Sequence, residues 1–181
     1  MPTITWRKWV CTALNKHMAD VSKSKLFATG TGILNKDACI VLVKTEWNAA
    51  IVDELEKACR SELLRQSVIK IITITVPGAF EIPFAIRQHW SAAGKKKRPD
   101  AFIALACVIR GDTPHFDYVC RAVTDGVLEL NLSLPVPTIF GVLTVDNEEQ
   151  AKERTGGKHG HKGTEAALAA LKMIALSKEN K

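Results

Sequence analysis

A short segment of the chain carries several side chains that can act in catalysis. Residues 110–120 read RGDTPHFDYVC and follow directly on the apolar run DAFIALACVI. Histidine is the commonest general acid or base in enzymes, so we interpret His115 as a candidate for moving protons during a reaction. The alternative is that His115 lies in the first turn of a helix and only bonds the backbone there.

The three residues Gly111, Asp112 and Thr113 precede this histidine and are typical of an anion site. Glycine permits a tight turn, and the free backbone N–H groups at the start of a helix attract negative charge. A threonine hydroxyl adds a further hydrogen-bond donor. The simpler interpretation is that Asp112 or Thr113 only caps the helix that follows.

Three further side chains are candidates for binding a ligand. Trp47 suits stacking on a flat molecule, or it belongs to the core. Glu81 suits hydrogen bonds from a polar heterocycle, or it only complements a helix dipole. Arg154 suits a phosphate through its planar guanidinium, and the alternative is a surface ion pair with a nearby acid.

The segment KHGHK, residues 158–162, contains residue types that occur in metal sites. Two histidines one residue apart, with lysines outside them, form a poor coordination set, because metal sites combine three or four convergent ligands. We therefore expect no metal here. A solvated or phosphate-facing loop is the interpretation that we prefer.

Alternating strands and helices must position these residues. Four apolar segments rich in β-branched residues are expected to be strands, namely 38–45, 68–76, 100–109 and 137–145. Helices are expected at 48–64, 77–90, 115–130, 147–155 and 163–176. Near-continuous apolar strands separated by helices are typical of a parallel sheet that is buried on both faces. The sequence therefore predicts a three-layer αβα sandwich around a four-stranded parallel sheet.

Residues near the expected helix starts support these boundaries. Asn48 is a plausible N-cap for the first helix, and Asn147 or Asp146 for the short helix that follows the fourth strand. Pro83 is tolerated in the first turn of the second helix.

The carboxyl ends of the expected strands are where the reactive residues gather. In open parallel sheets, ligands bind in a crevice beyond these ends. Trp47, Glu81 and His115 each follow a different strand, so we expect them to lie around one crevice.

Composition and charge fit one globular domain and argue against nucleic-acid binding. The 181 residues are 46% hydrophobic and 24% charged, with a net charge of +6. Residues 1–36 hold six Lys or Arg and one Asp, and residues 95–98 read KKKR. No aromatic residues are interleaved as in surfaces that stack bases. We expect residues 1–35 to form a partly disordered arm and residues 36–181 to form the domain.

The sequence also predicts where the protein is found. No apolar run is long enough to cross a bilayer, and the first residues do not have the pattern of a signal peptide. The five cysteines are odd in number and form no CxxC pair, which is typical of reduced thiols. We therefore expect a cytoplasmic protein without membrane association.

Four motifs, in order along the chain, resemble those of the lumazine synthase family. They are VPGAFEIPFA, CVIRGDTPHFDYV, IFGVLT, and NEEQAKERTGG with HKG. The resemblance covers residues 38–176 and implies a flavodoxin-like fold. It also implies a riboflavin-biosynthesis enzyme that condenses 5-amino-6-(ribitylamino)pyrimidinedione with 3,4-dihydroxy-2-butanone 4-phosphate. The products would be 6,7-dimethyl-8-ribityllumazine, phosphate and water, without a metal or an organic cofactor.

The resemblance implies a role for each residue at a matching position. One group would bind the pyrimidine and its ribityl chain: Trp47, Ala79, Phe80, Glu81, Cys107, Val108 and Ile109. A second group would bind the phosphate: Asp112, Thr113 and Arg154. His115 would move protons. Two residues would reach the pocket from a neighbouring subunit: Phe140 and Lys162.

Two further points follow from the same resemblance. Asp112 departs from the apolar or glutamate residue of relatives, so backbone N–H groups rather than its side chain would meet the phosphate. Members of the family form pentamers, and many assemble twelve pentamers into a hollow icosahedral shell. The segment TGGKHGHKG carries no insertion of the kind found in relatives that stop at pentamers.

Two other functions stay open on the residues alone. One is a shell that binds flavin or lumazine and has lost activity. The other is a different phosphosugar enzyme, such as an isomerase or an aldolase, on the same kind of sheet. The first is less favoured because His115 and Arg154 are both present, and the second because no Schiff-base lysine or metal set lies near the strand ends.

Overall fold

The computed structural model describes residues 37–94 and 97–179. The predicted arm, residues 1–35, and part of the KKKR segment lie outside the described residues. Four parallel strands form one sheet in the order β2-β1-β3-β4. Their bounds are β1 Cys39–Thr45, β2 Lys70–Val76, β3 Ala101–Ile109 and β4 Thr138–Val145.

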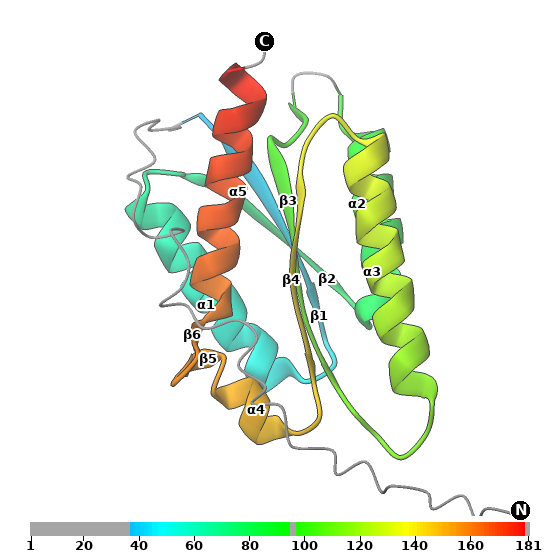
Figure 1. Ribbon diagram of the computed structural model, residues 1–181. Helices are drawn as coiled ribbons and strands as arrows, with labels where there is room; N and C mark the ends of the chain where they lie inside the picture. The colour runs from blue at the N-terminus through cyan, green and yellow to red at the C-terminus, as the bar shows by residue number, and fades with distance from the viewer. Residues whose placement is uncertain (1–36, 95–96, 180–181) are drawn as a thin grey trace, which may run out of the picture.

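Helices cover both faces of this sheet (Figure 1). The long helices are α1 Ala49–Arg65, α2 Ile82–Ala92, α3 His115–Ser133 and α5 Lys162–Glu179. A 3₁₀ turn, η3 Ala79–Glu81, precedes α2, and the short helix α4 Glu148–Lys152 follows β4. Helices α1 and α5 lie on one face, and α2 and α3 on the other. The predicted three-layer αβα sandwich is confirmed.

Alternation along the strands divides the core into two layers. On β1, Ile40 and Leu42 pack with α1 and α5, whereas Val41 and Val43 pack with α2 and α3. All four side chains are fully buried because successive side chains of a strand point to opposite faces. Each layer is therefore a separate apolar cluster with the backbone of the sheet between them.

The prediction that every strand is buried on both faces is wrong for β2. This strand lies at the edge of the sheet, and most of its residues are exposed or half-buried. Ile72 is 43% exposed. An edge strand has a partner on one side only, so apolar composition alone does not decide its burial.

A second difference is the segment predicted as a loop after α4. Two short strands, β5 Thr155–Gly157 and β6 Gly160–His161, form an antiparallel hairpin. Gly156 has a φ of 115°, a conformation that side-chain-bearing residues rarely adopt. Because β5 begins at Thr155, the predicted helix at 147–155 ends early, at Lys152.

The predicted helix starts are met in different ways. Asn147 caps α4, since its Oδ1 accepts from the Gln150 backbone N–H at 2.9 Å. The second helix begins at Ile82 and not at residue 77 as predicted, and this later start is what places Pro83 in its first turn. Neither Asp112 nor Thr113 caps α3, because Pro114 occupies the N-cap position without a side-chain bond.

A network of charged side chains joins β1, β2 and α1. Lys44 Nζ lies 2.7 Å from Glu56 Oε2 and 2.8 Å from Asp53 Oδ1. Thr73 Oγ1 donates to Glu56 Oε1 at 2.8 Å, and Arg60 donates to the same oxygen at 3.2 Å. Burial raises the pKa of Glu56, but the hydrogen bonds from Lys44, Thr73 and Arg60 outweigh it, so the pKa lies below its ordinary value.

Replacing Glu56 with Gln is expected to change how stability depends on pH. A carboxyl with a lowered pKa stabilises the fold above its ordinary pKa, and this contribution is lost as the pH falls through the folded-state value. At pH 7, Glu56→Gln should lower the free energy of unfolding by about 1–2 kcal/mol. The difference from the parent chain should be smaller at pH 3. Urea unfolding at both pH values measures it.

Glu54→Gln is the matched control, because Glu54 contacts Lys57 at 3.5 Å with both side chains exposed. This variant should change stability by less than about 0.5 kcal/mol. A Glu56 effect that is equal at pH 7 and at pH 3 would contradict the argument.

Candidate active site

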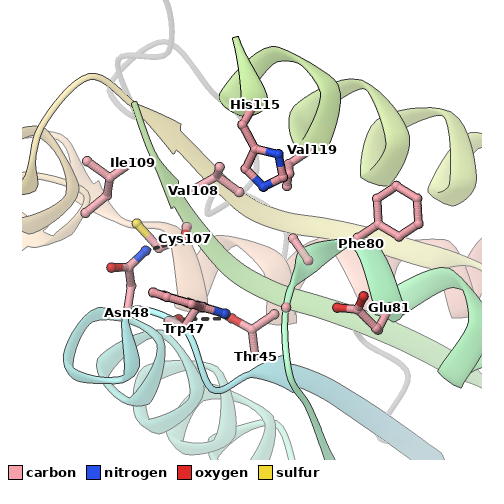
Figure 2. Close-up of a pocket in the computed structure, with 12 residues that line it drawn as sticks. Thr45, Trp47, Asn48, Phe80, Glu81, Cys107, Val108, Ile109, His115 and Val119 are labelled. Atoms are coloured by element: carbon pink, nitrogen blue, oxygen red, sulfur yellow. Dashed lines mark hydrogen bonds between the residues drawn. The ribbon is translucent and has the colours of Figure 1, made fainter. Parts of the chain in front are cut away.

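One open pocket lies beyond the carboxyl ends of β1, β2 and β3. Its volume is about 490 Å³. Figure 2 shows the residues that line it: Thr45, Trp47, Asn48, Gly78, Ala79, Phe80, Glu81, Cys107, Val108, Ile109, His115 and Val119. Parallel strands place their carboxyl ends at one edge of the sheet, and this explains why residues so distant in sequence meet.

Trp47 follows β1 and presents its indole to the pocket. Trp47 is 73% exposed, so the alternative that it belongs to the core is wrong. Its backbone N–H donates to the Pro77 carbonyl at 3.3 Å, and its own carbonyl accepts from Thr45 Oγ1 at 3.2 Å. A fixed backbone with an open aromatic face suits stacking on a flat ring.

The turn after β2 forms a second wall. Gly78 precedes η3, and a Cβ added there would lie 3.0 Å from Glu81 Oε2 and 3.6 Å from Trp47 Cδ1. The missing side chain therefore leaves room between the indole and the carboxylate. Phe80 is 63% exposed and borders the same space.

The end of β3 and the start of α3 form the third wall. His115 is the first residue of α3, and Val119 lies one turn further on. Figure 2 shows His115 on the side of the pocket opposite Trp47. Burial, with a smaller effect of Glu148, raises the pKa of the Cys107 thiol to about 11. The thiol is therefore protonated at neutral pH and is no nucleophile.

Arg110 anchors the loop between β3 and α3. Its guanidinium lies 4.1 Å from the ring centre of Phe116, donates to Asp117 at 3.2 Å and donates to Asp146 at 3.4 Å. Its backbone N–H donates to the Val145 carbonyl at 2.9 Å. The segment that carries Asp112 and Thr113 is thus fastened at both ends.

Five of the predicted site residues do not line this pocket: Asp112, Thr113, Phe140, Arg154 and Lys162. Asp112 and Thr113 are exposed on the loop next to His115. Arg154 donates to the Gln150 carbonyl at 2.8 Å. Phe140 and Lys162 line a separate cavity of about 240 Å³ between β4 and α5, where Lys162 Nζ lies 2.8 Å from Glu165 Oε2.

Sequence reasoning missed four residues that line the pocket: Thr45, Asn48, Gly78 and Val119. Val119 could have been found, because it lies four residues after His115 and therefore on the same face of a helix. Asn48 occupies the N-cap position of α1, as predicted, but its side chain makes no cap bond. Its amide donates to the Cys107 carbonyl at 2.8 Å instead.

Two observations concern the described ranges 37–94 and 97–179 alone. There, no group of three or more His, Cys, Asp or Glu side chains is arranged to hold a metal ion. None of the helices in these ranges has the length and apolar character needed to span a bilayer.

Comparison with known proteins identifies the family. Residues 37–178 match the family model of 6,7-dimethyl-8-ribityllumazine synthase. A 6,7-dimethyl-8-ribityllumazine synthase of Porphyromonas gingivalis is 48% identical over 145 residues, which are 79% of this chain and 88% of that protein. One of Cytophaga hutchinsonii is 49% identical over 136 residues, 74% of this chain and 83% of that protein. The chain therefore belongs to the 6,7-dimethyl-8-ribityllumazine synthase family.

Proposed function

We propose that the pocket beyond β1, β2 and β3 is the place where the chain carries out the reaction of its family. The chain is a transferase of riboflavin biosynthesis. It condenses 5-amino-6-(ribitylamino)pyrimidinedione with 3,4-dihydroxy-2-butanone 4-phosphate to 6,7-dimethyl-8-ribityllumazine. One observation carries the placement: an exposed indole, a carboxylate and an imidazole, from Trp47, Glu81 and His115, border one space of about 490 Å³.

The pyrimidine and its ribityl chain are proposed to bind between the first two walls. The Trp47 indole would stack on the pyrimidine, since flat rings favour offset stacking with aromatic side chains. The ribityl hydroxyls would donate to the Glu81 carboxylate beside Ala79 and Phe80. Backbone groups of Cys107, Val108 and Ile109 would bond the edge of the ring. Their place at the end of β3 supports this role.

The phosphate is proposed to bind on the other side of His115. The backbone of Asp112 and Thr113 lies directly before α3, where free N–H groups favour an anion. Arg154 would add a planar guanidinium. His115 would then lie between the two substrates and transfer protons as the imine forms, phosphate leaves and the ring closes.

The complete site is proposed to form between subunits of a pentamer. Phe140 and Lys162 lie outside the pocket of their own chain and would complete the pocket of a neighbour. Large apolar side chains that stay exposed on the described part of the chain support an interface, among them Tyr118, Leu128 and Leu132 on α3. Leu128 and Leu132 are one turn apart and share a face of the helix.

Assembly of twelve pentamers into a shell and a cytoplasmic location belong to the same proposal. The short hairpin β5–β6, without an insertion, supports the shell, because closed point-group assembly needs pentamers that approach each other closely. The four described cysteines are free, and this supports a reducing compartment. Residues 36–181 are proposed to form the catalytic domain.

Replacing Arg154 with Ala is expected to separate the two substrates kinetically. Loss of a charged phosphate contact should raise KM for the butanone phosphate by about 10–100-fold, while KM for the pyrimidine stays within about twofold. Arg154→Lys should recover little, because lysine lacks the planar fork. Steady-state kinetics with each substrate varied in turn measures both values.

Arg65→Ala serves as the control, since Arg65 pairs with Glu62 at the far end of α1. It should leave both KM values unchanged. Equal increases of the two KM values in Arg154→Ala would indicate a structural role instead.

The assembly is expected to be much larger than a single chain. Sedimentation velocity should show a species of about sixty subunits if the shell closes. In a closed assembly every subunit interface is occupied, so the number of subunits is fixed. A single species near five chains would rule out the shell and keep the pentamer. A species near one or two chains would contradict the shared site.

An assay of lumazine formation from the two substrates tests the proposed function directly. A flavin-binding shell without activity would bind the product but form none. An isomerase or aldolase would consume the butanone phosphate without the pyrimidine.

A further inference from the structure

We propose that Asn48 is a positioning residue, which sets the spacing between the Trp47 indole and the backbone at the end of β3. This inference rests on the proposed function of the pocket. Two independent features carry it: the unusual backbone conformation of Asn48 and the hydrogen bond of its side chain to a different strand.

The backbone of Asn48 is left-handed, with φ 57° and ψ 41°. An N-cap residue is ordinarily extended, and its side chain bonds the first turn of its own helix. Asn48 does neither, although its carbonyl accepts from the backbone N–H groups of Ile51 and Val52 at 3.0 and 3.1 Å. Asparagine tolerates this conformation better than other residues with a side chain. The turn leads the chain into α1 immediately after Trp47.

The side chain of Asn48 spans the gap at which the sheet opens. Pairing of β1 with β3 ends at Lys44 and Leu105. Beyond this pair, Asn48 Nδ2 donates to the Cys107 carbonyl at 2.8 Å, as the dashed line in Figure 2 shows. The amide thus joins the two strand ends at the level of the pocket.

This bond completes the attachment of Trp47 to its surroundings. On the side of β2, the Trp47 backbone N–H donates to the Pro77 carbonyl. On the side of β3, the adjoining Asn48 amide holds the Cys107 carbonyl, and Val108 follows at the pocket wall. A ring stacked on the indole meets the β3 backbone with its edge, so Asn48 controls whether both contacts form at once.

Three substitutions separate the two features. Asn48→Gly keeps a left-handed backbone at low cost and removes the amide. Asn48→Asp keeps the shape and tolerates the backbone, but its carboxylate cannot donate to a carbonyl. Asn48→Ala loses both features and is expected to be the least stable of the three.

The expected result is a selective loss in pyrimidine binding. In both Asn48→Gly and Asn48→Asp, KM for the pyrimidine should rise by about 5–10-fold, the effect of one lost hydrogen bond. KM for the butanone phosphate should stay within about twofold, because the bond between Asn48 and Cys107 does not involve the loop of Asp112 and Thr113, where the phosphate is proposed to bind. Steady-state kinetics at a temperature where each variant is folded gives both values.

Asn131→Ala is the matched control. Asn131 makes a similar clamp at the opposite edge of the sheet, where its side chain bonds both the N–H and the carbonyl of Thr138 at 2.9 and 2.8 Å. This variant should lose stability and leave both KM values unchanged, so a loss of stability alone cannot imitate the predicted result.

Several outcomes would overturn the inference. One is an unchanged KM for the pyrimidine in both Asn48→Gly and Asn48→Asp. Another is an equal rise of the KM values for the two substrates. A third is a rise of the KM for the pyrimidine in Asn48→Asp alone, which would indicate repulsion by the new charge. Trp47→Ala separates this failure from that of the proposed function. If the pocket does not bind the pyrimidine, Trp47→Ala will leave its KM unchanged as well.

Discussion

Replacing His115 with Gln should lower kcat by about 10²–10⁴-fold, the usual contribution of a general acid or base. Glutamine keeps a polar side chain of similar reach but cannot exchange a proton near neutral pH. His115 is exposed at the start of α3, so the substitution should not disturb the core. KM for the pyrimidine should change by less than about threefold, because stacking and ribityl contacts involve other residues. Single-turnover kinetics isolates the chemical step when the enzyme is in excess over the butanone phosphate and the pyrimidine is saturating.

His89→Gln provides the comparison. His89 lies near the end of α2 and contacts the Phe102 ring edge-on, with 6.0 Å between ring centres. It does not line the pocket, so kcat should stay at the parent value. If His115→Gln keeps the parent kcat too, His115 moves no proton in the rate-limiting step.

Among glycine substitutions that add a single methyl group, Gly163→Ala is expected to be the most destabilising. Gly163 lies in the first turn of α5, and an added Cβ would collide with the carbonyl oxygen of Leu55 in α1. The obstacle is backbone, so the two helices must move apart. Overpacking of this kind costs about 1–3 kcal/mol, and we expect the upper end of that range. Urea unfolding followed by circular dichroism measures the loss.

Gly94→Ala is the matched glycine substitution, because a Cβ added at Gly94 meets nothing within 4 Å. It should be neutral or slightly stabilising, since alanine has less freedom to lose on folding. A Gly163→Ala chain as stable as Gly94→Ala would mean that α1 and α5 can separate without cost.

The strands and long helices could be predicted because their apolar residues follow the period of each element. The four strands begin and end within two residues of the prediction, and β3 is buried along most of its length. The position of β2 at the sheet edge could not be predicted, because strand order does not follow from composition. The hairpin β5–β6 was missed because its two strands have three and two residues, too few for a periodic pattern.

The gathering of Trp47, Glu81 and His115 around one pocket could be predicted from their places after successive strands. The contact of Asn48 with Cys107 could not, because it depends on how far β1 and β3 diverge at their ends. Phe140 and Lys162 share no wall with His115 in one chain. Sequence spacing alone gives no sign of this, since β4 ends at the same edge of the sheet as β3.

The division of the core into two apolar layers has a consequence for epistasis. Leu42 and Val43 are neighbours in sequence, yet they pack against different helices and share no cluster. Substitutions that lie more than about 7–10 Å apart and share no partner usually have additive effects on unfolding free energy, whereas those within one cluster couple. During evolution, apolar residues that pack under α1 and α5 can therefore be exchanged without compensating substitutions in the layer under α2 and α3. Compensating pairs should be found within a layer and not across the sheet.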